Sequence, residues 1–155
     1  MNTCEIPSPA GPAPAPAGSR ILYFRPAAEG AAAHSWQGAE AADYKPPAAH
    51  HGGVLRTVLV GGQGEKTAFQ LRYFEIGPGG FTTLERHAHE HAVVVLRGRG
   101  EVRLGGAVYP VGFGDTVYVA PHEVHQFRNP SASEPFGFLC VVDADRDRPV
   151  PVEEE

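Results

Sequence analysis

The sequence predicts a single all-β domain, a closed antiparallel barrel of the double-sheet jelly-roll type. The chain has 155 residues, which suits one domain, and its 42% content of hydrophobic residues is enough for one barrel core. The chain contains 19 glycines and 15 prolines, and after residue 50 these residues separate short apolar runs. Short strands joined by turns of Gly and Pro give this pattern, and no segment after residue 50 has the period of a helix.

The N-terminal third has a different composition. Residues 1–20 alternate proline with alanine and glycine, and such a segment buries too little apolar surface to offset the entropy of ordering, so we predict a disordered tail. Residues 21–53 are expected to form an arm that is partly ordered against the barrel. A short strand is expected at residues 21–24, and Trp36 and Tyr44 are candidates to pack on the barrel surface.

Residues 54–142 are predicted to form the barrel. Eight β-like runs occur there, each followed by a turn signal such as the Gly-Pro-Gly-Gly of residues 77–80. The expected strands are 54–60, 69–76, 92–97, 101–104, 108–111, 116–120, 124–128 and 136–142.

The charge distribution excludes several classes of partner. Residues 51–142 carry eight Lys or Arg against eight Asp or Glu, while residues 143–155, which we predict to be an acidic C-terminal tail, carry six acids and two arginines. Without a basic stripe we expect no nucleic-acid binding, and without a long apolar stretch we expect no membrane span. The N-terminus does not read as a secretory signal, so a cytoplasmic location is expected. A disulfide between Cys4 and Cys140 is not expected.

A cluster of histidines points to a metal site. His87, His89 and His91 alternate, and they share one face with Glu85 if the strand runs unbroken through them. Imidazoles crowded on an inward face repel one another once protonated and are tolerated where a cation draws their lone pairs together. His125 lies in a later strand that barrel closure can bring opposite the first group. The alternation alone fits a solvated strand edge as well, so the histidine pattern by itself leaves both interpretations open.

Two stretches of the chain carry a family resemblance. The segment that begins at Gly114 ends on His125 and, after three further residues, on Asn129. It resembles the second conserved stretch of the cupins, which reads Gly, five residues, Pro-x-Gly, two residues, His, three residues, Asn. The final His and Asn match this pattern. The Pro and Gly do not, although Pro121 lies one residue beyond the place of the proline.

The first conserved stretch of the cupins fits without gaps from Gly79. The family pattern reads Gly, five residues, His-x-His, three or four residues, Glu, six residues, Gly. In this chain Glu85 takes the place of the first His and His87 that of the second. His91 then takes the place of the Glu, and Gly98 closes the stretch. A Glu and a His have therefore changed places relative to the family pattern.

The resemblance implies a jelly-roll barrel that binds one divalent metal ion per chain, either Fe, Mn, Ni, Cu or Zn. A shifted fit makes His87 and His89 the His-x-His pair and needs a shorter turn before His91. His87, His91 and His125 remain candidate ligands in both fits, and the fourth ligand is either Glu85 or His89.

Other side chains are candidates for a substrate pocket beside the metal. An inward-facing Arg72 would bind a substrate carboxylate with two parallel hydrogen bonds, and the alternative is that Arg72 faces solvent. For the apolar candidates, the alternative is packing in the barrel core. The candidates are Arg72, Phe74, Gln126, Phe127, Phe138 and Cys140.

A metal site leaves the reaction open, because one fold serves many functions. We expect a metal-dependent oxygenase, an oxidoreductase of dioxygenase type that acts on a small organic substrate. The alternatives are a non-catalytic sensor or binding module for a small molecule and a metal-assisted isomerase or lyase that needs no O₂. Family analogy and the exposed edge strands of such barrels predict a homodimer.

Overall fold

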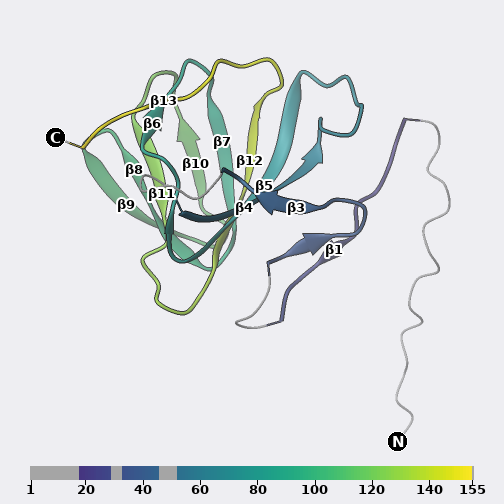
Figure 1. The fold of residues 1–155 in the computed structure, drawn as a ribbon, viewed down its shortest axis with the longest axis horizontal. Helices are drawn as coiled ribbons and strands as arrows, with labels where there is room; N and C mark the ends of the chain where they lie inside the picture. The colour runs from purple at the N-terminus through teal and green to yellow at the C-terminus, as the bar shows by residue number, and fades with distance from the viewer. Residues whose placement is uncertain (1–17, 29–32, 46–51, 155) are drawn as a thin grey trace, which may run out of the picture.

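The computed structural model describes residues 18–28, 33–45 and 52–154, and within them every regular element is a β-strand (Figure 1). This confirms the predicted all-β barrel. The strands are β1 (Phe24–Arg25), β2 (Ser35–Trp36), β3 (Ala41–Asp43), β4 (Gly52–Val60), β5 (Phe69–Phe81), β6 (Glu85–Arg86), β7 (His91–Arg97), β8 (Arg99–Leu104), β9 (Ala107–Gly112), β10 (Thr116–Val119), β11 (His125–Arg128), β12 (Phe136–Asp143) and β13 (Val150–Pro151). No described residue belongs to a helix that could cross a membrane.

Two antiparallel layers curl toward each other to enclose the core. One layer runs β3–β4–β5–β12–β7–β10, and the other contains β6, β8, β9 and β11. β11 joins the layers because it pairs with β8 along four residues and also with the end of β5. The two layers are therefore linked through one short strand, which begins with His125.

Alternation along each strand decides which side chains face the interior. In β7 the side chains of His91, Val93 and Val95 are buried while those between them are exposed. β12 lies beside β7 with Cys140 opposite Val93, so the interior faces of the two strands meet. The core consists mainly of valines and phenylalanines from both layers, which is the filling expected of a small barrel.

β5 differs from the prediction, because the expected turn at residues 77–80 is absent and the strand continues to Phe81. The N–H of Gly79, whose φ is +72°, donates hydrogen bonds to the carbonyl oxygens of Asn129 and Ser131. The pairing with β4 shifts register between Gly52 and Val54. The glycines therefore act as a bulge that bends one long strand from the first layer into the second, where a turn would have ended it.

The N-terminal arm packs on the outer face of the first layer. β1 pairs with β2, and the indole ring of Trp36 lies 4.9 Å from the ring of Tyr73 in β5. The Tyr73 hydroxyl and the backbone N–H of His34 both donate hydrogen bonds to Glu75, at 2.8 and 2.9 Å. The predicted packing of Trp36 is confirmed, and the short strand is Phe24–Arg25 where we expected residues 21–24. Most of the predicted disordered segment, residues 1–17, lies outside the described residues.

The acidic C-terminal segment lies along the barrel. β13 pairs with β6, and the N–H of Ala144 donates a hydrogen bond to the carbonyl of Ala68. The carboxylate of Asp147 accepts hydrogen bonds from the backbone N–H groups of Ala88 and His89. Residues 143–154 are thus bound to the loop that carries the histidines.

Asn129 provides a test of how the barrel closes. Its side chain is 1% exposed, donates to the carbonyl oxygens of Ile76 and Glu134, and accepts from the N–H of Ser131. We expect Asn129→Ala to lower the free energy of unfolding by about 2 kcal/mol, because one buried and two partly buried backbone groups lose their partner. Urea denaturation measures this change. The exposed Ser133→Ala in the same loop should change stability by less than about 0.5 kcal/mol, and equal losses in both variants would contradict the assignment.

Candidate metal centre

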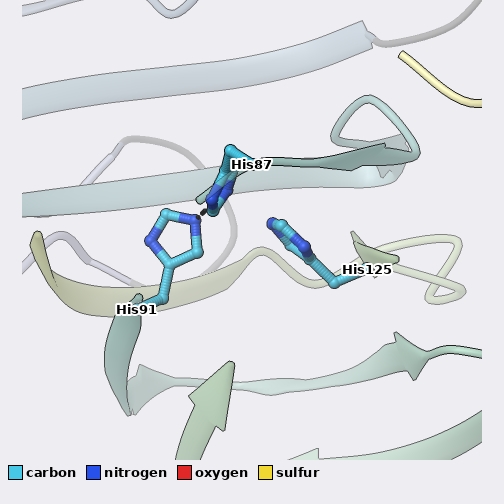
Figure 2. A group of neighbouring side chains, drawn as sticks. All are labelled: His87, His91 and His125. Atoms are coloured by element: carbon cyan, nitrogen blue, oxygen red, sulfur yellow. Dashed lines mark hydrogen bonds between the residues drawn. The ribbon is translucent and has the colours of Figure 1, made fainter. Parts of the chain in front are cut away.

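Three histidines from three separate chain segments converge in the barrel interior. His87 lies in the loop after β6, His91 begins β7 and His125 begins β11. All three side chains are buried, and a ring nitrogen of each lies within 4.8 Å of those of the other two. Figure 2 shows the three rings turned toward one common point. The chain therefore holds a buried His triad able to bind a metal ion.

The outer ring nitrogens of the triad are fixed by hydrogen bonds. Nδ1 of His87 lies 2.8 Å from the carbonyl oxygen of His89, and Nδ1 of His125 lies 2.9 Å from that of Glu123. A carbonyl oxygen only accepts, so both Nδ1 atoms carry the proton and both Nε2 atoms keep a free lone pair. Nδ1 of His91 contacts the sulfur of Cys140 at 3.2 Å. Histidines that ligate metals are oriented in this way by a partner on the other ring nitrogen.

The inner nitrogens of His87 and His91 approach each other within hydrogen-bond distance. Nε2 of His91 lies 2.8 Å from Nε2 of His87 (Figure 2). With Nδ1 protonated on His87, its Nε2 presents only a lone pair to the neighbouring ring. A divalent ion coordinated by both rings would convert this close approach into two metal–nitrogen bonds of about 2.1 Å. Imidazole donors suit Zn, Cu, Fe and Ni, and no choice among these metals follows from the ligands.

Burial keeps the triad neutral. Burial, together with a smaller effect of the neighbouring imidazoles, lowers the pKa of His87 to about 4 and that of His91 to about 2. The pKa of His125 is lowered as well, again chiefly by burial. Neutral imidazole is the form that binds metal, so at neutral pH the lone pairs are available without loss of a proton.

The candidates for a fourth ligand occupy different surroundings. Glu85 is buried, pairs across strands with His125 and lines the cavity beside the triad, where Nζ of Lys45 lies 3.2 Å from its carboxylate. The ring of His89 stacks on that of His87 with centroids 3.6 Å apart, and its Nδ1 lies 2.7 Å from the carboxylate of Asp147. Neither residue belongs to the group of donor atoms within 4.8 Å.

No unbroken strand runs through the histidines, so the condition under which Glu85, His87, His89 and His91 would share one face is not met. β6 ends at Arg86, residues 87–90 form a loop, and β7 begins at His91. Asp147 holds this loop by accepting from the N–H groups of Ala88 and His89, which fixes an irregular backbone instead of a strand. The convergence of His87 and His91 therefore comes from the turn of the loop and not from strand alternation.

A small cavity of about 30 Å³ adjoins the triad, which is room for about two water molecules. Five of the six predicted pocket residues line it, namely Arg72, Phe74, Phe127, Phe138 and Cys140. Gln126 does not, which corrects the prediction. It lies between the inward residues His125 and Phe127, so its side chain points to the opposite face of β11 and donates to the carbonyl of Thr82.

Several residues of the site carry no sequence signal. Tyr44 and Thr82 line the cavity, although we placed Tyr44 only on the barrel surface. Lys45 reaches Glu85 from the N-terminal arm, and Asp147 reaches His89 from the C-terminal segment. These contacts join residues 40 or more positions apart, and no local motif marks them.

Comparisons with known proteins place the chain among related barrels. The sequence model of a family described as "Cupin domain" matches residues 72–142. A Rhodospirillum rubrum protein named 1-methylthio-D-xylulose 5-phosphate methylsulfurylase is 46% identical over 117 residues, covering 75% of this chain and 73% of that protein. A probable (S)-ureidoglycine aminohydrolase of Oryza sativa subsp. japonica is 32% identical over 80 residues, which are 51% of this chain and 26% of the relative.

Solved structures agree with this placement. A cupin-2 domain from Rhodospirillum rubrum superposes with a TM-score of 0.72 at 44% identity, covering 79% of this chain and 81% of that structure. A cupin 2 conserved barrel domain protein from Rhodopseudomonas palustris superposes with a TM-score of 0.70 at 40% identity, covering 83% and 85% respectively.

Removal of one ligand should abolish tight metal binding without unfolding the barrel. We expect His125→Ala to weaken affinity for a divalent ion by about 100-fold or more, with the circular dichroism spectrum unchanged because the apolar layers carry the fold. Elemental analysis after dialysis and competition with a chelator measure the effect. His122→Asn is the control, since His122 lies in a turn at φ 64° that asparagine tolerates. Unchanged metal content in the alanine variant would show that the site is misplaced.

The metal-free protein should lose stability as the pH falls below 6.5. The native pKa values of His87 and His91 lie below the unfolded value of 6.5, so the unfolded chain binds protons that the native rings do not. Stability from these groups is present above pH 6.5 and declines by about 1 kcal/mol per histidine between pH 6.5 and 5.5.

Urea denaturation at several pH values measures this dependence. The window lies above the range in which carboxyl groups titrate, so acids such as Asp147 contribute little to it. His87→Gln should show a shallower slope than the unchanged protein, and an identical slope would contradict the prediction.

Proposed function

This chain belongs to the cupin family, and from that premise we propose that it is a metal-dependent enzyme that cleaves the carbon–sulfur bond of a methylthio-substituted ketopentose phosphate. The observation that carries the proposal is the 46% identity over 117 residues to a relative named for that substrate. The aligned region covers three quarters of this chain. The buried triad of His87, His91 and His125 supplies the metal site that such chemistry can use.

The named substrate has features that match the candidate site. In 1-methylthio-D-xylulose 5-phosphate the methylthio group sits on the carbon next to the ketone, and the phosphate is at the other end of the five-carbon chain. A bound divalent ion would act as a Lewis acid toward the ketone oxygen and so stabilise the enolate that receives the carbon–sulfur bond electrons. A thiolate co-substrate would attack the sulfur and leave with the methylthio group as a mixed disulfide, and the enolate would then take up a proton to give the 1-deoxy ketose phosphate.

The residues of the chain have distinct parts in this proposal. His87, His91 and His125 hold the ion, while the rings of Phe74, Phe127 and Phe138 wall the cavity and exclude water. Excluding water strengthens electrostatic interactions within the site and prevents side reactions.

The substrate is larger than the cavity of about 30 Å³. It would therefore have to displace the side chain of Tyr44, which covers Phe74 with ring centroids 5.0 Å apart at an angle of 88°. Tyr44 directly follows the edge strand β3 and is only partly buried against the core, so the proposal requires this side chain to move.

The oxygenase expected from the sequence is a second proposal. Three clustered nitrogen donors beside a space for about two waters would leave ligand positions on an ion open for O₂ and substrate. The name of the relative favours carbon–sulfur chemistry, and a requirement for O₂ separates the two proposals. The sensor, the isomerase or lyase, and the homodimer remain predictions.

Turnover of the synthetic substrate tests the proposal. Protein stripped with a chelator and reloaded separately with Mn, Fe, Ni, Cu or Zn is incubated with 1-methylthio-D-xylulose 5-phosphate, with and without a small thiol as acceptor of the methylthio group. We expect loss of the methylthio group under strict anaerobiosis, followed by ³¹P NMR and mass spectrometry. His91→Gln should lower the rate by about 100-fold or more, as expected when a group needed for transition-state stabilisation is removed.

The outcomes separate the candidate functions. Turnover that occurs only with O₂ would favour the oxygenase. No turnover with any of these metals, with or without thiol, would overturn the proposed carbon–sulfur cleavage.

A further inference from the structure

We propose that Arg72, together with Arg56 and Arg146, forms the subsite that binds the phosphate group of the substrate. This inference rests on the proposed function for the identity of the substrate. Its physical basis is the guanidinium of Arg72, which lines the cavity, together with two nearby arginines; none of the three forms an ion pair with an acid among the described residues.

Arg72 is a buried cation without a counter-ion. Its side chain is 4% exposed on the inner face of β5, opposite Cys140 of β12. One terminal nitrogen donates to the sulfur of Cys140 at 3.4 Å, the guanidinium carbon lies 4.9 Å from the Phe74 ring centroid, and Nε has no hydrogen-bond partner. No described acid forms an ion pair with it.

A charge in this position is costly unless an anion accompanies it. Burying an unpaired guanidinium costs several kcal/mol, and a thiol with an aromatic face compensates only part of that. Arg97 shows the usual arrangement for a shielded arginine, because it donates to the carboxylate of the buried Glu75 at 2.9 Å. Arg72 lines the cavity and keeps one donor without a partner, an arrangement that an anionic ligand in the cavity would complete.

Two further arginines flank the same wall. Arg56 of β4 lies opposite Phe74 across the strand pair, and its guanidinium carbon is 5.5 Å from the ring centroid of Tyr44. Arg146 follows β12 and donates to Gln70 and to the carbonyl of Asp143. Gln70, which accepts from Arg146, lies two residues before Arg72 in β5 and so on the same face of that strand. Burial lowers the pKa of Arg146, as do the positive charges of Arg72 and Arg56.

The acid at this cavity does not neutralise the arginines. Glu85 lines the cavity but is engaged by Lys45 at 3.2 Å. The pair is neutral overall, and the histidine triad is neutral as well. A ligand that carries two negative charges is therefore favoured at the arginines, and a phosphate oxygen pair matches the planar fork of a guanidinium.

The subsite also lies close enough to the metal to serve one small substrate. The sulfur of Cys140 contacts both Arg72, at 3.4 Å, and the candidate ligand His91, at 3.2 Å. A single sulfur atom thus separates the guanidinium from the triad. A ketopentose phosphate can place its phosphate at the arginines while its ketone end reaches the metal.

Binding of inorganic phosphate to the full-length, metal-free protein tests the subsite without any catalytic readout. The Nε–H signals of the arginines are followed by NMR during the titration, with calorimetry for affinity. We expect phosphate to shift the Arg72 signal and Arg72→Met to weaken binding at least tenfold. Arg99→Met is the matched control, because Arg99 is exposed beside a different cavity, and it should bind as the unchanged protein does.

Arg146→Met covers the case in which the buried substitution does not fold, since Arg146 is half-buried outside the barrel layers. It should weaken phosphate binding about threefold to tenfold. Absence of phosphate binding by the unchanged protein would overturn the inference, as would equal affinity in the Arg146 and Arg99 variants.

A second arm compares D-xylulose 5-phosphate with D-xylulose. We expect only the phosphorylated sugar to bind in an Arg72-dependent manner. If phosphate binding depends on Arg72 but the methylthio substrate is not cleaved, this inference stands and the proposed function falls. If the substrate is cleaved and Arg72→Met leaves KM unchanged, the inference falls and the proposed function stands.

Discussion

The site depends on the removal of three imidazoles from water. Because His87, His91 and His125 are buried, their charged forms are disfavoured and their rings stay neutral well below the usual pKa. Backbone carbonyls fix the proton of two rings on the outer nitrogen, so lone pairs face the centre. The same burial that keeps protons away thus prepares the triad for a metal ion.

The architecture of the barrel follows from this requirement. The bulge in β5 bends one strand through both layers and brings β11, with His125, over the strands that carry His91. Asp147, from the C-terminal segment, fixes the loop of His87. Three distant parts of the chain therefore contribute to the position of the triad, and loosening any of them would disturb its geometry.

Electrostatics divides the cavity wall into two halves. The histidine half is neutral and fits a cation, whereas Arg72 gives the other half a positive charge that forms no ion pair with a described acid. Cys140 sits between the two and contacts a member of each. A small substrate with a metal-binding group at one end and an anionic group at the other matches this division. A sugar phosphate of the kind named for the relative has both groups, so the comparison and the arrangement of charges support the same class of substrate.

The sequence by itself determined the strands and most of the ligands. Turn signals and apolar runs located eight strands of the barrel, and the spacing of the cupin pattern singled out His87, His91 and His125, because these features depend on local periodicity. Only the tertiary structure decided the features that depend on long-range register. It carried β5 through residues 77–80, broke the histidine strand into a loop held by Asp147, and turned Gln126 away from the cavity.

The unpaired state of Arg72 belongs to this second group. Whether an arginine has a counter-ion depends on which distant strands pack against it, and a one-residue change of register would move every side chain of a strand to the other face. Local propensity sets where strands occur. The closure of the layers sets which side chains meet inside them, and so which chemistry the barrel can carry out.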